Sequence, residues 1–248
     1  MRRDHVRWIV LAAAVALFIA VIVNTAWWQT VFGAVFTAHT EVLYPRATPL
    51  VLVWEHVQLV GISSAITIAI GIPLGVWVTR PSGRPFLQLV TDVTSIGQTF
   101  PPVAVLALAV PALGFGLVPT VVALFLYGLL PVVRNTIAGI RSVPVDVLDA
   151  AYGVGMGRWP ALWRVELPLA APVILAGVRI SVIINIGTAM IGAVIGAGGL
   201  GTAVVAGLVR DNVAFVFEGA LAAALLAVLV DQLLHTVETS LDRARGGG

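Results

Sequence analysis

Residues 145–168 read VDVLDAAYGVGMGRWPALWRVELP and stand between two long apolar runs. They hold three of the chain's 12 acidic residues and two of its 14 basic ones, which is dense charge for this sequence. A short, charged loop that is rich in helix signals is suited to contact another protein. A loop that packs only against its own chain is the alternative that these residues leave open.

Prolines and glycines divide this stretch into two short helices around a turn. Pro144 suits the first turn of the first helix, where its missing N–H costs nothing, and Ser142 or a nearby group would cap it. Pro160 permits a second helical start, and Pro168 ends the segment. The first helix is expected to end at three glycines, since glycine adopts positive φ without steric cost: Gly153, Gly155 and Gly157.

The composition places this loop in a membrane protein. Of the 248 residues, 59% are hydrophobic and only 10% are charged, whereas soluble domains carry about 25% charged residues. The mean hydropathy is +1.03. Cysteine is absent, which excludes disulfides, thiolate metal sites and cysteine nucleophiles. The four histidines are scattered and form no HExxH pair, so an intramembrane metalloenzyme has little support.

The apolar runs predict an all-α membrane protein with six transmembrane helices. The first run starts at Trp8 and extends to Trp27 and Trp28, a pair that suits the headgroup level; a signal peptide is the alternative for this start. Residues 29–56 are mixed in polarity and predict an external segment. The expected spans are 8–28, 57–78, 86–112, 118–134, 172–196 and 213–236.

Two of these spans come from one long uncharged run. Residues 93–133 would reach about 60 Å as a single helix, roughly twice the hydrocarbon thickness of a membrane. The run must therefore fold back, and GFGLVP at residues 114–119 supplies the turn. Pro101 and Pro102 are expected to break or bend its first half, because proline has no N–H to donate.

Arginine, the only basic residue type used apart from histidine, orients the spans. With the amino terminus in the cytosol, only Arg46 and Arg210 lie outside and the other twelve arginines lie inside. The opposite topology would reverse this ratio. Both termini and the loop at residues 135–171 are therefore expected in the cytosol, so the partner of the loop is expected to be a cytosolic protein.

The loop also has a specific internal spacing. Asp149-Ala150-Ala151 is followed after three residues by Gly155, and after nine more by Val165 and Leu167-Pro168. This spacing resembles the EAA motif of bacterial ABC importer permeases, which usually have Glu at the position of Asp149 and often Ile at that of Val165. The resemblance implies a coupling helix that docks into a groove on an ATPase subunit. It assigns ATPase coupling to Asp149, Ala150, Ala151, Gly155, Val165, Leu167 and Pro168.

Several other segments extend the likeness. They are QTFPP at 98–102, YGLLPVVRN at 127–135, LAGVR at 175–179, GAGGLG at 196–201, and the segment from Gly219 to Asp231. These resemble the osmoprotectant branch, whose permeases carry glycine betaine, choline, carnitine or proline betaine. The resemblance implies the MetI-like fold of type I ABC importers. Residues 50–240 would form the permease domain with a cytosolic coupling loop at 140–171, and residues 1–49 a first transmembrane helix and external segment.

The same resemblance implies a transport subunit of the bacterial plasma membrane without an ATPase site of its own. This chain would bind no cofactor or metal, and ATP and Mg would bind in the partner subunit. The implied partners are a cytosolic ABC ATPase dimer, a second permease copy or paralogue, an extracytoplasmic substrate-binding protein and the lipid bilayer, but no nucleic acid. A permease for another small solute, such as an amino acid, remains an alternative. So does an ion-coupled carrier in which Asp92, Glu218 or Asp231 relays protons.

Polar residues within the spans are candidates for the translocation path, because each is costly in a bilayer. Gln88, Asp92, Ser95 and Thr99 share one face of a helix, although hydration at the cytosolic end would also explain the first two. Asn185 and Thr188 face a pore or make interhelical hydrogen bonds. The candidate path residues are Asp92, Ser95, Gln98, Thr99, Asn185 and Thr188.

Near the external side, GAGGLG at residues 196–201 lacks the Lys-Ser/Thr ending of a phosphate loop. It is expected to let the backbone turn sharply at an external gate, with Gly198, Gly199 and Gly201 as the gate candidates. Glu218 is expected to pair with Arg210. A stripe of Asp231, His235 and Glu238 is expected to be a hydrated helix end or to pair with a loop arginine.

Overall fold

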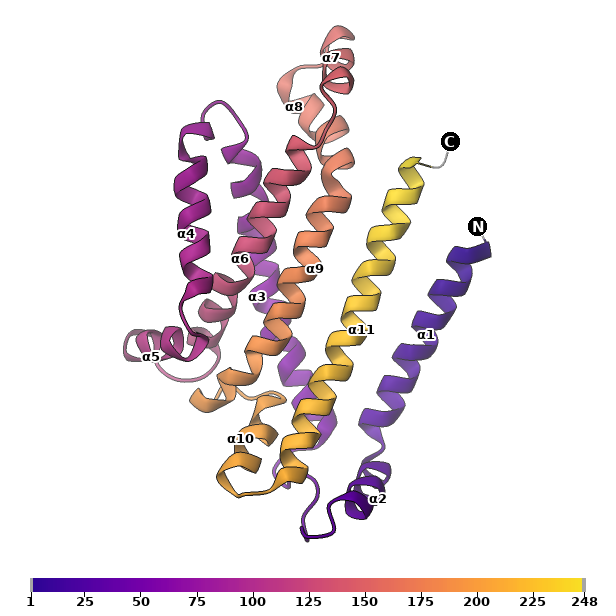
Figure 1. Cartoon of the computed structure of the whole chain (residues 1–248), viewed down its shortest axis with the longest axis vertical. Helices are drawn as coiled ribbons and strands as arrows, with labels where there is room; N and C mark the ends of the chain where they lie inside the picture. Colours follow the sequence, from indigo (N-terminus) through magenta and orange to yellow (C-terminus); the bar gives the residue numbers. More distant parts are fainter. Residues whose placement is uncertain (1, 247–248) are drawn as a thin grey trace. The chain divides into compact units, whose positions relative to one another are not determined.

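The computed structural model describes residues 2–246, with side chains for residues 6–240. This range is helical and contains no strand, as the sequence predicts (Figure 1). The long helices are α1 (Arg2–Val23), α3 (Pro49–Val78), α6 (Leu117–Arg141), α9 (Leu167–Gly192) and α11 (Val213–Gly246). The shorter ones are α2 (Thr25–Val35), α4 (Leu87–Thr99), α5 (Pro102–Leu113), α7 (Val145–Gly153), α8 (Arg158–Ala161) and α10 (Gly201–Val209). Short 3-10 turns lie at Arg84–Phe86 and Ala193–Ile195, and a π turn lies at Leu162–Glu166.

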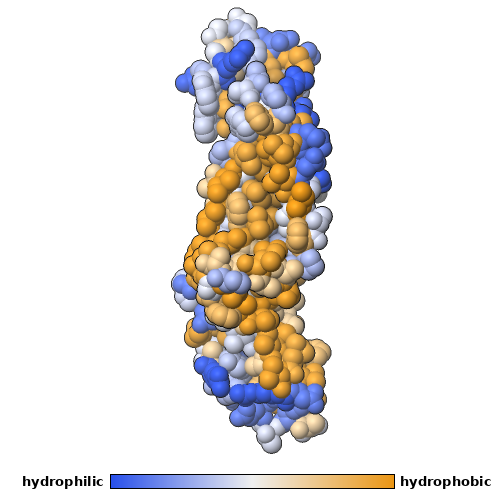
Figure 2. Space-filling model, turned by 90° about the vertical axis from the view of Figure 1, so that its left-hand side faces the viewer, coloured by the Kyte–Doolittle hydropathy of each residue, from blue (hydrophilic) through white to orange (hydrophobic). Residues whose placement is uncertain are grey.

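Five helices in the described range are long and apolar enough to cross a membrane, and α4 with α5 makes a sixth if this bent pair is one span. The pair bends by 97°. Pro101 and Pro102 lie at the break, and Pro102 begins α5, where no N–H is required. The chain then folds back through Gly114 and Gly116, at φ of 77° and 95°. Hydrophobic residues make up most of the face seen in Figure 2, as expected of helices that face lipid.

The first expected span is interrupted. Asn24 separates α1 from α2, and its side-chain Oδ1 accepts a hydrogen bond from the Trp27 N–H at 3.0 Å, which caps α2. Trp28 is fully buried, and its indole N–H donates to the carbonyl of Val21 at 2.8 Å. The expected interfacial tryptophan pair is therefore wrong for Trp28, because the break turns this side chain into the core.

The second span begins earlier than expected. α3 starts at Pro49, so Glu55 and His56 lie inside the helix and not in an external segment. Their charge and polarity suggested exposure, but both side chains have partners elsewhere in the chain. The last span also continues to Gly246, and α10 is a helix that the sequence did not predict.

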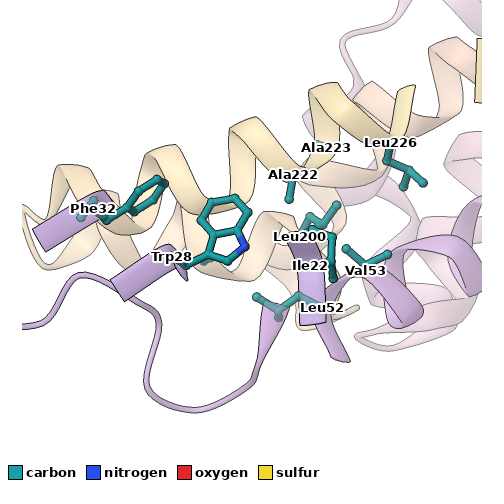
Figure 3. Close-up of a cluster of buried hydrophobic side chains, with 11 residues drawn as sticks. Ile22, Trp28, Phe32, Leu52, Val53, Leu200, Ala222, Ala223 and Leu226 are labelled. Carbon is teal, nitrogen blue, oxygen red and sulfur yellow. The ribbon is translucent and has the colours of Figure 1, made fainter. Parts of the chain in front are cut away.

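The chain forms two compact units. The first contains residues 1–63, 100–125 and 183–233, and the second contains residues 64–99, 126–182 and 234–248. The core of the first unit joins α1, α2, α3, α10 with Leu200 just before it, and α11 (Figure 3). It consists of Ile22, Trp28, Phe32, Leu52, Val53, Leu200, Ala203, Ala214, Ala222, Ala223 and Leu226.

In the second unit, α3, α6 and α9 approach closely at glycines. A Cβ on Gly75 would lie 2.7 Å from Thr136 Cβ, and one on Gly139 would lie 2.9 Å from the Ala170 carbonyl oxygen. Such contacts require small residues and are typical of membrane helix packing. A buried apolar cluster next to them contains Ile140, Leu162, Ala170 and Ile174, with Ile72, Val76 and Leu167 packed against it.

Candidate coupling loop and substrate route

The loop between α6 and α9 contains the two short helices that its prolines and glycines predict. Pro144 is the N-cap residue of α7, in an extended conformation (φ −61°, ψ 138°) and without a side-chain capping bond. Ser142 is not the cap that we expected. Its hydroxyl instead donates to the Gly139 carbonyl of α6 at 2.8 Å, one residue after that helix ends at Arg141. The helix therefore starts without a side-chain cap, at a residue whose φ is fixed by the proline ring.

A single glycine makes the turn after α7. Gly155 has φ of +86°, and its N–H donates to the Tyr152 carbonyl at 2.9 Å. The next residue, Met156, donates to the Ala151 carbonyl at 3.1 Å, which closes the turn. Gly153 belongs to α7 and Gly157 has φ of −76°, so the expectation of positive φ holds for Gly155 alone among these three glycines.

The second half of the loop runs into α9 without a stop. Pro168 was expected to end the segment, but it lies in the first turn of α9. The π turn at Leu162–Glu166 makes this possible, because the Leu167 N–H donates to the Leu162 carbonyl five residues back. The wider turn accommodates a residue that cannot donate its own hydrogen bond. Residues 158–195 consequently form one continuous helical candidate span.

The motif residues fall into an exposed group and an inward group. Asp149, Ala150 and Gly155 are exposed, whereas Ala151 is buried. The inward group also includes the half-buried residues Val165, Leu167 and Pro168. The loop also leaves four large apolar side chains 65–77% exposed: Val145, Val154, Trp159 and Trp163. Exposed apolar side chains gathered on a structured loop are typical of interaction sites.

Glu166 is a functional candidate that the sequence analysis missed. Its carboxylate accepts two hydrogen bonds from the guanidinium of Arg80, Nη1 to Oε1 at 2.9 Å and Nη2 to Oε2 at 2.6 Å. Glu166 occupies the unspecified position of the motif, between Val165 and Leu167, so the spacing gave no reason to select it. The signal that could have selected it is a single acidic residue between the apolar residues Val165 and Leu167.

The polar stripe of α4 is largely satisfied within its own unit. Gln88 donates to Asp92 at 2.8 Å on an exposed face, while the Ser95 hydroxyl donates to the Thr91 carbonyl at 2.7 Å and accepts from Arg134 at 3.2 Å. The two path candidates that follow also bond to main-chain carbonyls: Gln98 to Tyr127 at 2.6 Å and Thr99 to Ile96 at 2.8 Å. Their role in a translocation path stays a prediction.

In α9, the contacts of Asn185 support an interhelical hydrogen bond and not a place in the pore. Its side chain is fully buried, and its amide donates to the Ser63 hydroxyl of α3 at 3.4 Å. Thr188, one turn later, is half-buried. The hydrogen bond between Asn185 and Ser63 therefore joins α9 to α3. Thr188 is the more accessible of the two path candidates in α9.

The glycine turn at residues 196–201 is tied to α3. The Gly199 N–H donates to Glu55 Oε2 at 2.8 Å, and His56 Nε2 lies 2.9 Å from the Ile186 carbonyl. Gly198 and Gly199 have φ of +81° and +80°, so the sharp backbone turn occurs where the sequence predicts it. Gly201 starts α10, and a Cβ there would collide with the Met190 carbonyl. Glu55 and His56 are thus part of the candidate gate.

Two other acids, Glu218 and Glu238, have partners that differ in part from those expected. Glu218 is buried and accepts from the Tyr44 N–H at 2.7 Å, whereas Arg210 lies 3.9 Å from Glu41. The expected Glu218–Arg210 pair is therefore wrong. Near the carboxyl end of α11, Glu238 pairs with Arg179 at 3.3 Å. An arginine does pair with this stripe, but it comes from α9 and not from a loop.

Within the described residues, no group of three or more His, Cys, Asp or Glu side chains is placed to hold a metal.

A sequence profile for the binding-protein-dependent transport system inner membrane component matches residues 71–244. The chain belongs to this family. The matched region begins within α3 and includes the whole loop with its Gly155 turn and the glycine turn at 196–201. A chain of this family is a permease component of an inner membrane transport system.

Similar proteins include permeases that are named for osmoprotectant and for choline transport. The osmoprotectant import permease protein OsmY of Salmonella typhimurium is 43% identical over 195 residues, covering 78% of this chain and 83% of its own. The choline transport system permease protein OpuBB of Bacillus subtilis is 39% identical over 191 residues, covering 77% of this chain and 87% of its own. A solved structure, the MetNI methionine ABC transporter in an inward facing conformation, matches with a TM-score of 0.68 at 22% identity and shares the fold. It covers 77% of this chain and 94% of its own.

Proposed function

We propose that this chain is the transmembrane permease subunit of an ATP-driven importer of osmoprotectants such as glycine betaine, choline, carnitine or proline betaine. The observation that carries the proposal is the loop at residues 145–168. It combines the EAA spacing with a folded helix–turn–helix and a set of exposed apolar side chains, in a chain of the binding-protein-dependent permease family.

The loop supplies the docking surface for a cytosolic ABC ATPase dimer. Trp159 and Trp163 are 71% and 65% exposed, and large aromatic side chains are common anchors at protein interfaces. Asp149 and Ala150 lie exposed on α7 at the other side of the Gly155 turn. ATP and Mg bind in that partner, and this chain contributes no ATPase chemistry.

Movement of the ATPase reaches the helices through the base of the loop. α8, the π turn and α9 are continuous in the backbone, and Leu162 and Leu167 pack into the cluster with Ile140 of α6. A displaced loop therefore moves α6 and α9 together with it. A second permease copy or a paralogue completes the pathway, and an extracytoplasmic binding protein delivers the solute.

The solute class is supported by the relatives. Two proteins of Bacillus subtilis and Listeria monocytogenes, each 39% identical, are named for glycine betaine/carnitine/choline and for carnitine transport. These compounds share a small quaternary ammonium group. A permease for an unrelated small solute, such as an amino acid, is the competing assignment, and the MetNI likeness supports only the fold.

Uptake of radiolabelled glycine betaine and choline tests the proposal. The chain is expressed with its ATPase and binding protein in a strain that lacks its other osmoprotectant systems. We expect uptake of at least one of the two compounds that stops when the catalytic glutamate or lysine of the ATPase is replaced. Uptake that persists without an active ATPase and follows the membrane potential would instead indicate an ion-coupled carrier.

A further inference from the structure

The ion pair of Arg80 and Glu166 joins the end of α3 to the base of the coupling loop. Both guanidinium Nη atoms donate to the two carboxylate oxygens, at 2.9 and 2.6 Å. The Glu166 side chain is 4% exposed and that of Arg80 is 27% exposed. A two-point contact of this kind fixes orientation as well as distance, which a single hydrogen bond does not.

Arg80 is firmly part of the α3 end. Its N–H donates to the Trp77 carbonyl at 2.9 Å, and its own carbonyl accepts from the N–H groups of Gly83 and Arg84 at 3.0 and 2.8 Å. The following turn is also closed tightly, because a Cβ on Gly83 would collide with the Trp77 carbonyl. The backbone of Arg80 is therefore held to the last turn of α3.

Stability alone does not call for an ion pair at this place. Ile72 and Val76 of α3 already pack against the cluster that contains Leu162 and Ile174. Replacing a buried ion pair by apolar residues of similar volume is often neutral or stabilising, because removing the charges from water is costly. What an apolar contact lacks is a fixed orientation, and the fork between Arg80 and Glu166 provides it.

The same helix carries the contacts to the glycine turn. Glu55 of α3 accepts from the Gly199 N–H at 2.8 Å, and a Cβ on Gly199 would lie 3.1 Å from His56 Nδ1. α3 is a single helix from Pro49 to Val78, so one element connects to the coupling loop near its end and to the candidate gate near its start.

We propose that the Arg80–Glu166 pair is the positioning contact through which the coupling loop moves α3, and that α3 in turn moves the glycine turn at residues 196–201. This inference rests on the proposed function, because it concerns how ATP hydrolysis in the partner is passed to the substrate route. Loss of the pair leaves the loop docked and the ATPase active, but α3 then keeps only the apolar contact of Ile72 and Val76 and no longer holds a fixed orientation to the loop.

The test measures import and ATP hydrolysis in the same proteoliposomes, with the whole complex, its binding protein and radiolabelled glycine betaine or choline. For Glu166→Gln and Arg80→Gln we expect normal assembly and sustained hydrolysis. The number of solutes imported per ATP should fall about tenfold, within the range typical of coupling between sites. The charge-swapped chain with Arg80→Glu and Glu166→Arg should recover most of that ratio.

Arg80→Lys keeps the inference testable if the uncharged variants do not assemble. Lysine keeps the charge but provides a point contact and not a fork, so we expect an assembled complex with a lower import-to-ATP ratio. Arg179→Gln is the matched control. It removes the Arg179–Glu238 pair of the same unit, which joins α9 to α11 outside the loop, and it should leave the ratio unchanged.

Three outcomes separate this inference from the proposed function. A wild-type ratio in Arg80→Lys and in the assembled glutamine variants would overturn the role of the pair, while the importer assignment would stand. Equal losses in Arg179→Gln would also overturn it, because the effect would then not be specific to the loop. Absence of ATP-dependent import by the wild-type complex with both compounds would overturn the proposed function itself.

Discussion

At the scale of single residues, Gly155 is the position on which the shape of the coupling loop depends. Its φ of +86° lies in the left-handed region, which costs roughly 1–2 kcal/mol for other residues. No atom lies within 4 Å of the place where its Cβ would stand, so any effect of a substitution arises from the backbone and not from a clash. Gly153, two residues earlier, has equally open surroundings but a helical conformation.

This difference makes a matched pair of variants. Gly155→Val is expected to leave membrane insertion intact and to abolish ATP-driven uptake, because the turn reorients the surface that meets the ATPase. Gly153→Val adds the same side chain nearby without the backbone penalty and should keep most of the uptake. Copurification with the ATPase and solute uptake measure both. Normal uptake by Gly155→Val would remove the support for docking through this turn.

At the scale of elements, the contact between α3 and the glycine turn decides how the candidate gate is held. Gly198 and Gly196 both have positive φ, at +81° and +76°. A Cβ on Gly198 would lie 2.6 Å from Glu55 Oε2. A Cβ on Gly196 would have no neighbouring atom within 4 Å. A substitution at either glycine therefore strains the backbone in the same way, but only a substitution at Gly198 also disturbs the contact with Glu55 of α3.

We expect Gly198→Ala to lower the midpoint of thermal unfolding in detergent more than Gly196→Ala does. The additional loss arises from displacement of Glu55 and of its hydrogen bond to Gly199, at a cost on the order of 1–3 kcal/mol. Repeating both substitutions in a Glu55→Ala background should remove most of the difference, as a double-mutant cycle requires. A difference that is unchanged in that background would mean that Glu55 does not hold the turn.

At the scale of the whole molecule, the distribution of arginines predicts which ends of the helices meet the cytosol. Only Arg46 and Arg210 fall outside in the predicted topology. Val154 of the loop and Val209 at the end of α10 are 77% and 81% exposed and would lie on opposite sides of the membrane. Because the chain has no cysteine, one introduced thiol is unique.

Single-cysteine variants therefore test the topology. A membrane-impermeant thiol reagent should label Val209→Cys in intact cells that lack an outer membrane barrier. It should label Val154→Cys only after the membrane is opened or inverted, with the chain expressed without its ATPase. The reverse pattern would invert the topology and place the 145–168 loop outside the cytosol.

Features that depend on local chemistry could be predicted from the amino-acid sequence alone. Charge content and apolar runs gave the membrane class, and missing proline N–H groups gave the break at Pro101 and Pro102. The spacing from Asp149 to Pro168 led to the permease family, which the family match then showed. Local patterns were less reliable at the ends of helices. Ser142 does not cap α7 as predicted, and Pro168 lies in the first turn of α9 and does not end the segment.

The partners of the polar groups depend on contacts between residues that are far apart in the sequence. Glu166 and Arg80 are 86 positions apart, and Glu55 and Gly199 are 144 apart, so no local pattern relates them. Glu55 was predicted to be exposed in an external segment, because burial is costly for an unpaired charge. The fold supplies the missing donor or acceptor, and that long-range pairing turns an apparent surface residue such as Glu55 into part of the interior.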